Sequence, residues 1–230
     1  MTCVTGSNNA DERKGKIRPD TIVGFTSGPK KVSLVVRGKQ GPNHHPDKLD
    51  QHADCIRQNG APIGFFGEGN DGSLNGIGLG MNGVVYDYNL FQRHRPQYVE
   101  LNIAVSRRVV STVLLVEVDQ ATANKFDEAW WRMRTNPGSF DIVGNNCATH
   151  ASAAFIYAGV VTSGIPWMDT PDNLYGQLVD QIPAGRRTSY TGFVGFIPAG
   201  GGFTMEIRPY TPSPTVNSPN QGSWGGSSGA

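Results

Sequence analysis

The sequence predicts an α+β fold, in which an antiparallel sheet of about five or six strands packs against two principal helices. Short runs of β-branched and aromatic residues recur along the chain and are separated by Gly, Pro, Asn and Ser, as expected for strands joined by turns. Two longer stretches, residues 121–134 and 147–158, instead repeat their apolar residues at spacings of three and four. That period is typical of helices that cover one face of a sheet.

The predicted strands are spread over most of the chain. In order, they are residues 21–25, 32–36, 63–66, 84–88, 98–105, 113–118 and 192–197, with a further short strand at 203–207. A turn at residues 27–29, Ser-Gly-Pro, joins the first two strands, so these two are expected to pair with each other.

The helix predicted at residues 121–134 has a clear apolar face and a clear end. Its apolar residues are Phe126, Ala129, Trp130 and Met133. Asp119 or Thr122 can cap its first turn, and Pro137 lies just beyond its last residue. A shorter helix is predicted at residues 171–179, because it opens with proline, which favours the first helical position.

Composition and length indicate one folded domain with appendages. The chain has 230 residues, of which 37% are hydrophobic. We predict a flexible N-terminal arm at residues 1–19, a folded domain at 20–208 and a disordered tail, rich in Gly, Pro and Ser, at 209–230. The Gly-rich residues 67–83 lack the Lys-Ser/Thr pair of a phosphate-binding P-loop. We therefore predict that they form a mobile loop beside a cleft.

Charge, cysteine usage and hydropathy argue against several classes of protein. The net charge of +1 and the lack of a basic run with interleaved aromatics argue against a nucleic-acid partner. Three widely spaced cysteines suggest neither a disulfide framework nor a zinc site, and no cofactor is expected. No apolar run reaches the roughly 18 residues of a membrane span, and the first residues lack a signal-peptide pattern, so we expect synthesis in the cytoplasm.

One cysteine lies where a helix is predicted to begin. A polar corner at Gly144-Asn145-Asn146 precedes Cys147, and the helical pattern that starts there ends at Gly159. Asn145 or Asn146 is the expected N-cap. Because the free N–H groups and the dipole of a helix N-terminus stabilise negative charge, a thiol there ionises more easily and can act as a nucleophile. The alternative is a small apolar residue of the core.

This segment resembles a known group of enzymes. Asn145-Asn146-Cys147, opening an Ala-rich helix, is similar to the nucleophile helix of the circularly permuted papain-like enzymes. These belong to the NlpC/P60-related group, which includes bacterial cell-wall peptidases and lecithin:retinol acyltransferase-like proteins. The resemblance covers roughly residues 84–179 and implies a papain-like antiparallel sheet packed against the helix that bears the nucleophile. Residues 20–208 would then be the catalytic domain.

In the permuted order, the catalytic histidine precedes the cysteine in sequence. His52 matches a His-Ala pattern of the group. Residues 47–58, which can also be read as a helix, would then contain a strand. His94 is the second candidate, since it lies just before the strand predicted at 98–105. His150 lies on the same helix face as Cys147 and is interpreted as a packing or hydrogen-bonding residue.

Two points about the site remain open from sequence. If residues 32–36 are instead the histidine-bearing strand of the group, the histidine position falls at Lys30 or Lys31, and the base of the group is missing. The residue that orients the imidazole is also undetermined. Its candidates are Asp87, Asp71 and Glu68. His44 and His45 fall in a predicted surface loop, where we expect them to be solvated.

The resemblance implies a cysteine peptidase or amidase that acts on bacterial peptidoglycan peptides. Cys147 would attack an amide carbonyl, and a histidine would return the proton to the leaving amine. By analogy, we expect an antibacterial toxin exported by a type VI secretion system to a target-cell periplasm, with an immunity protein as partner. The alternatives are a thiol acyltransferase or deamidase acting on a lipid or host protein, and a non-catalytic papain-like binding module.

Overall fold

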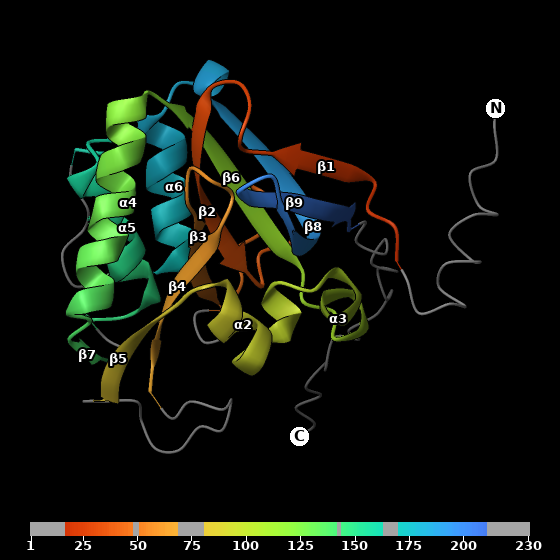
Figure 1. Cartoon of the computed structure of the whole chain (residues 1–230), viewed down its shortest axis with the longest axis horizontal. Helices are drawn as coiled ribbons and strands as arrows, with labels where there is room; N and C mark the ends of the chain where they lie inside the picture. Colours follow the sequence, from red (N-terminus) through yellow and green to blue (C-terminus); the bar gives the residue numbers. More distant parts are fainter. Residues whose placement is uncertain (1–16, 48–50, 69–80, 142–143, 163–169, 211–230) are drawn as a thin grey trace, which may run out of the picture.

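The computed structural model describes residues 17–47, 51–68, 81–141, 144–162 and 170–210. The fold is mixed α+β, with a nine-stranded antiparallel sheet and, among the described residues, five α-helices (Figure 1). The strands follow one another across the sheet in the order β1-β9-β8-β6-β2-β3-β4-β5-β7. Their bounds are Thr21–Gly24 (β1), Lys30–Arg37 (β2), His52–Ile56 (β3), Pro62–Gly67 (β4), Met81–Tyr86 (β5), Ser111–Val118 (β6), Ser139–Phe140 (β7), Arg187–Ala199 (β8) and Gly202–Pro209 (β9).

The helices cover both faces of this sheet. They are α2 (Tyr88–His94), α3 (Leu101–Ser106), α4 (Gln120–Thr135), α5 (Cys147–Tyr157) and α6 (Pro171–Gln181). Helices α4, α5 and α6 share one hydrophobic cluster with β2 and β6, whereas α2 belongs to the cluster on the opposite face. Helix α3 packs against β8, where Leu101 lies so close that a side chain on Gly195 would collide with it. None of the described helices has the length and apolar character needed to cross a membrane.

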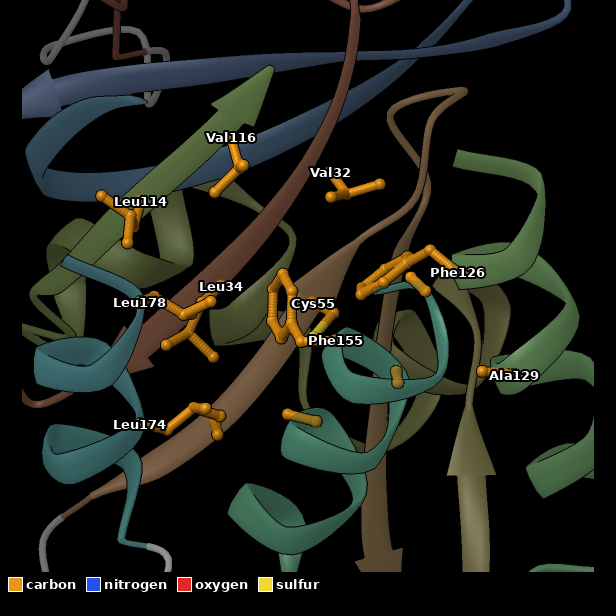
Figure 2. Packing of buried hydrophobic residues seen from close by; sticks show 14 of the residues in the cluster. Val32, Leu34, Cys55, Leu114, Val116, Phe126, Ala129, Phe155, Leu174 and Leu178 are labelled. Carbon is orange, nitrogen blue, oxygen red and sulfur yellow. The ribbon is translucent and has the colours of Figure 1, made fainter. Parts of the chain in front are cut away.

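Strand β2 lies at the centre and is buried on both faces. Val32 and Leu34 point toward α5 and α6, while Val35 points to the other side. Figure 2 shows Leu34 beside Leu174 and Leu178 of α6, with Phe155 of α5 close to Cys55 of β3. Because such a strand loses contact with water on both sides, its sequence reads as a continuous apolar run rather than as an alternation.

Most of the predicted elements are confirmed. The predicted helices at 121–134, 147–158 and 171–179 correspond to α4, α5 and α6, and Asp119 caps α4 by accepting from the Thr122 N–H at 2.7 Å. The sheet is antiparallel as expected, but it has nine strands rather than five or six. The described part of residues 47–58 contains strand β3 and no helix.

Three predictions about local structure are wrong. The first two strands do not pair with each other, because β1 pairs with β9 and β2 pairs with β3 and β6. Residues 98–105 form the end of a short 3-10 helix and then α3, not a strand. The buried residues of α3 are Leu101 and Ala104, a spacing of three, which is a helical period. His94 therefore ends helix α2 and does not precede a strand.

Some predictions fall outside the described residues. These include most of the predicted arm and tail, residues 1–16 and 211–230, and most of the Gly-rich segment, residues 69–80. At the boundary of the arm, the backbone N–H of Ile17 donates to the side chain of Asn102 at 2.8 Å.

Candidate functional site

Cys147 is the first residue of α5, and the polar corner before it forms the cap. The side chain of Asn146 accepts from the N–H groups of Ala148 and Thr149 at 2.9 and 3.0 Å, which makes it the N-cap. Cys147 is 7% exposed, and its sulfur accepts a hydrogen bond from the backbone N–H of Ala53 at 3.4 Å. The sulfur thus lies between the start of one helix and strand β3.

Strand β3 supplies the imidazole that lies next to this sulfur. His52 is the first residue of β3, is 14% exposed and hydrogen-bonds to Cys147. Its Nε2 atom is bound to Oδ1 of Asp54 at 2.8 Å, so Nδ1 is the ring nitrogen left available to the sulfur. Because side chains alternate along a strand, His52 and Asp54 lie on the same face, while Ala53 and Cys55 point toward α5.

Asp54 is held in turn by a buried arginine from β2. Nε of Arg37 donates to Oδ2 of Asp54 at 2.8 Å, and the two side chains are 3% and 0% exposed. The other guanidinium nitrogens donate to Ser111 Oγ at 3.3 Å and to the carbonyl of Tyr98 at 3.0 Å. Arg37, Asp54, His52 and Cys147 therefore form a continuous line of alternating positive and negative groups.

Aromatic packing and one glycine fix this line in place. The His52 ring stacks on Phe66 of β4 with centroids 4.2 Å apart, and Tyr98 lies 5.8 Å away on the 3-10 helix Pro96–Tyr98. Gly64 lies opposite Asp54 on β4, and a Cβ atom there would fall 2.2 Å from Asp54 Oδ1. Glycine is therefore required at this position for the carboxylate to occupy its site.

The pKa values of the pair move in opposite directions. Burial raises the pKa of the Cys147 thiol, but the charge and hydrogen bond of His52 and the Ala53 N–H outweigh it, so the pKa lies below its ordinary value. Burial lowers the pKa of His52, but Cys147 and Asp54 outweigh it and raise that pKa well above its ordinary value. Although burial opposes it, the pKa of Asp54 is lowered by the charges of His52 and Arg37. These directions favour a thiolate beside an imidazolium.

The remaining histidines lie elsewhere. His94 has its ring 5.7 Å from Tyr86 at the end of α2. The His150 ring stacks on Phe65 at 3.4 Å and its Nδ1 is bound to the carbonyl of Asn146, as expected for a packing residue. Of the histidines predicted to be solvated, His45 is largely exposed but bound to a carboxylate, and His44 takes a hydrogen bond from the N–H of Gln40.

The two lysines considered from sequence lie away from this site. Lys30 and Lys31 begin β2 and pair with the end of β6, whereas the other end of β2 carries Arg37, which is opposite His52 in the register. The imidazole next to Cys147 therefore comes from β3 and not from β2.

The two of the carboxylates proposed from sequence that the structure describes, Asp87 and Glu68, do not contact His52. Asp87 caps α2 and pairs with Arg134 at 2.9 Å. Glu68 is exposed at the end of β4, and Asp71 lies outside the described residues. The residues that sequence reasoning missed are Asp54 and Arg37. A His-x-Asp spacing on a strand places both side chains on one face, and that signal was present at residues 52–54.

A second buried ionic group holds the segment before β3. The ammonium of Lys39, which is fully buried, lies 2.6 Å from Oδ1 of Asp172 in the first turn of α6, and His45 Nδ1 is 2.7 Å from Oδ2. The backbone N–H of Asp172 donates to the side chain of Gln51 at 3.0 Å. Since Gln51 directly precedes His52, this group ties the start of β3 to α6.

Within the described residues, no group of three His, Cys, Asp or Glu side chains could hold a metal ion. Comparison of the chain with protein-family models, with curated proteins and with solved structures finds no match. The site is therefore interpreted from its own geometry.

Proposed function

We propose that the protein is a cysteine-dependent amide hydrolase of the permuted papain-like kind. One observation carries this proposal: the sulfur of Cys147, at a helix N-terminus, is hydrogen-bonded to His52, whose far nitrogen is bound to Asp54 at 2.8 Å. A nucleophile, a base and a group that orients the base are the three parts that acyl transfer requires.

The proposed reaction has two stages. The Cys147 thiolate attacks the carbonyl carbon of an amide, and the oxygen becomes negatively charged. Among the described residues, no acceptor takes the N–H of Cys147, and we assign the oxyanion to it. The His52 imidazolium then donates its proton to the leaving amine as the C–N bond breaks. Finally, water that is deprotonated by His52 attacks the thioester and releases the acid and the thiol.

We further propose that the substrate is a peptide amide of bacterial peptidoglycan and that the protein is an antibacterial effector. The support is the similarity of the Asn-Asn-Cys helix to that of cell-wall peptidases, together with the thiol of Cys147 and the imidazole of His52 beside it. An immunity protein and a component of the secretion machine are the proposed partners, and the target-cell periplasm is the proposed place of action.

The acyltransferase alternative has weaker support. Such an enzyme needs an apolar surface or channel for the acyl chain next to its thiol. Among the described residues, the large exposed apolar side chains near α5 are Ile156 and Tyr157, at its far end, and Trp131 of α4, which is 65% exposed. With a rise of 1.5 Å per residue, that end lies about 15 Å from Cys147. The case for a binding module with a dead site rested on a missing base, and the position of His52 beside Cys147 weakens that case.

The test is cleavage of purified muropeptides by the wild-type protein, followed by mass spectrometry to locate the bond cut. We expect Cys147→Ala and His52→Ala to abolish cleavage while circular dichroism spectra stay unchanged. The same variants should remove lysis when the protein is directed to the periplasm of a susceptible cell. Intact muropeptides beside a modified lipid or protein would instead favour the acyltransferase.

A further inference from the structure

A cavity of about 240 Å³ adjoins the line of charged groups, with Arg37 in its wall, and has no role in the proposed chemistry so far. Its walls come from the end of β2, the 3-10 helix and the turn between α3 and β6. The residues that contribute polar side chains are Arg37, Gln40, Gln97, Tyr98 and Arg108.

The cavity is one side chain away from the imidazole of the site. Tyr98 lines it and lies 5.8 Å from the His52 ring, and the guanidinium of Arg37 lies 4.6 Å from the centre of the Tyr98 ring. Arg37 is also opposite His52 in the strand register. Tyr98 is therefore the side chain that lies between His52 and this cavity.

Arg108 makes the cavity cationic. The charge of Arg37 is balanced by Asp54, whereas Arg108 makes no ion pair with any carboxylate among the described residues. Gln97 accepts from Arg107 through its amide oxygen at 3.1 Å, which leaves its NH₂ group to donate. Positive charge that no described carboxylate balances, with neutral donors around it, matches a negatively charged group on a ligand.

The backbone of Arg108 indicates that its side chain is needed there. It is the one non-glycine residue with positive φ among the described residues, at 55°. It follows the last turn of α3, where glycine is the usual residue because it adopts this conformation without strain. A costly conformation at a position that glycine could fill points to a role for the side chain that occupies it.

We propose that this cavity is a subsite for a free carboxylate of the substrate, held by Arg108. The inference rests on the proposed amide hydrolase function and names its substrate class: a peptide that carries a carboxylate close to the scissile amide. Arg108 is then a specificity-determining residue, which binds the substrate but takes no part in bond breaking.

The experiment uses two synthetic stem tetrapeptides that are identical except that one has free carboxylates and the other has carboxamides. Binding of each to the full-length Cys147→Ala protein is measured by calorimetry, with and without Arg108→Gly. Glycine adopts the φ of 55° freely, so this variant keeps the turn. Lys125→Gln, an exposed charge on α4 across the sheet, is the matched control.

We expect the free acid to bind about 10- to 100-fold more tightly than the carboxamide, and Arg108→Gly but not Lys125→Gln to remove the difference. In active protein, Arg108→Gly should raise KM for the acid with little change in kcat. Equal binding of the two peptides, no binding of either, or no effect of Arg108→Gly would overturn the subsite. These binding titrations use the inactive Cys147→Ala protein. If the wild type fails to cut muropeptides, the proposed hydrolase function is rejected, while the titrations still report on the subsite.

Discussion

Replacing Asp54 by asparagine tests the line of charges with the smallest change of shape. The carboxylate has one oxygen bound to Arg37 and the other to His52, both at 2.8 Å. An asparagine would accept from Arg37 with its oxygen and therefore present its NH₂ group to Nε2 of His52. The imidazole proton would move to Nδ1, and His52 could no longer take a proton from Cys147.

The expected loss of kcat/KM in Asp54→Asn follows from the negative charge that the substitution removes. With about 4 Å between the centres of charge and an effective dielectric constant of about 20, Asp54 stabilises the imidazolium by about 4 kcal/mol. The positive charge of Arg37 offsets part of this stabilisation, so we estimate that the imidazolium loses about 3 kcal/mol in the variant. That is about two pKa units for His52 and about 100-fold in kcat/KM.

The assay is kcat/KM as a function of pH for the wild type and Asp54→Asn. The pKa of His52 is raised in the native protein, so the imidazolium persists at neutral pH and is lost as pH rises through that pKa. In the variant, the alkaline limb of the profile should move down by about two pH units. The rate of alkylation by iodoacetamide across the same pH range reports the thiolate directly.

Two further variants separate the effect of the lost Asp54 charge on the pH profile from loss of folded structure. Asp54→Asn leaves the buried Arg37 charge without its partner, which destabilises the fold, whereas a double variant that adds Arg37→Gln removes both charges. Asp87→Asn is the surface control, because asparagine also caps helices well and α2 should remain intact. An alkaline limb that does not move in either Asp54 variant would refute the role assigned to Asp54.

Three more outcomes follow from the packing. Gly64→Ala should lower both activity and the free energy of unfolding, by about 1–3 kcal/mol, since its methyl group would meet Asp54 Oδ1. Asp172→Asn should cost about 2–3 kcal/mol in urea unfolding at neutral pH, because it leaves the buried Lys39 ammonium unpaired. The pKa of Asp172 is lowered mainly by hydrogen bonds against the effect of burial, so its stabilisation is present above the unfolded pKa and is lost as pH falls through the folded pKa. His150→Phe should keep most activity, measured as kcat/KM, because the His150 ring stacks on Phe65 and a phenyl ring can do the same.

Each of these three variants has a control in which the same type of residue is replaced at a position outside the site. Gly176→Ala, in α6 with open space around it, should stabilise by about 1 kcal/mol. Asp180→Asn, exposed in the same helix, should leave urea unfolding unchanged. His94→Gln should behave as the wild type. A loss of activity in His94→Gln as large as in His52→Ala would contradict the assignment of the base.

Local patterns were sufficient to predict α4, α5 and α6 and the position of Cys147 at a helix start, but not α2 and α3. The spacing of apolar residues marks α4 and α5, and an asparagine followed by an Ala-rich run predicts that Cys147 begins a helix, as the structure has it. His52 could be proposed before the structure because the order histidine-then-cysteine and the His-Ala pair are both visible in sequence.

The partners of His52 depend on tertiary structure and were harder to find. Asp54 was missed because residues 47–58 also fit a helix, and only a strand places positions 52 and 54 on one face. Arg37 was missed because a charged residue at the end of an apolar run reads as a strand end in water, while the structure buries it against Asp54. Pairing of β1 with β9 joins segments far apart in the chain, and no local pattern specifies such a pair.

The order in which the sheet is assembled has a consequence for how the protein matures. The candidate triad and Arg37 all come from residues 37–147, on central strands and on α5, whereas β8 and β9 follow later and complete the sheet as far as β1. During synthesis, β6 must therefore present an unpaired edge until β8 exists, and β1 must wait for β9. This late, long-range closure, rather than formation of the thiolate pair, should set the pace of folding.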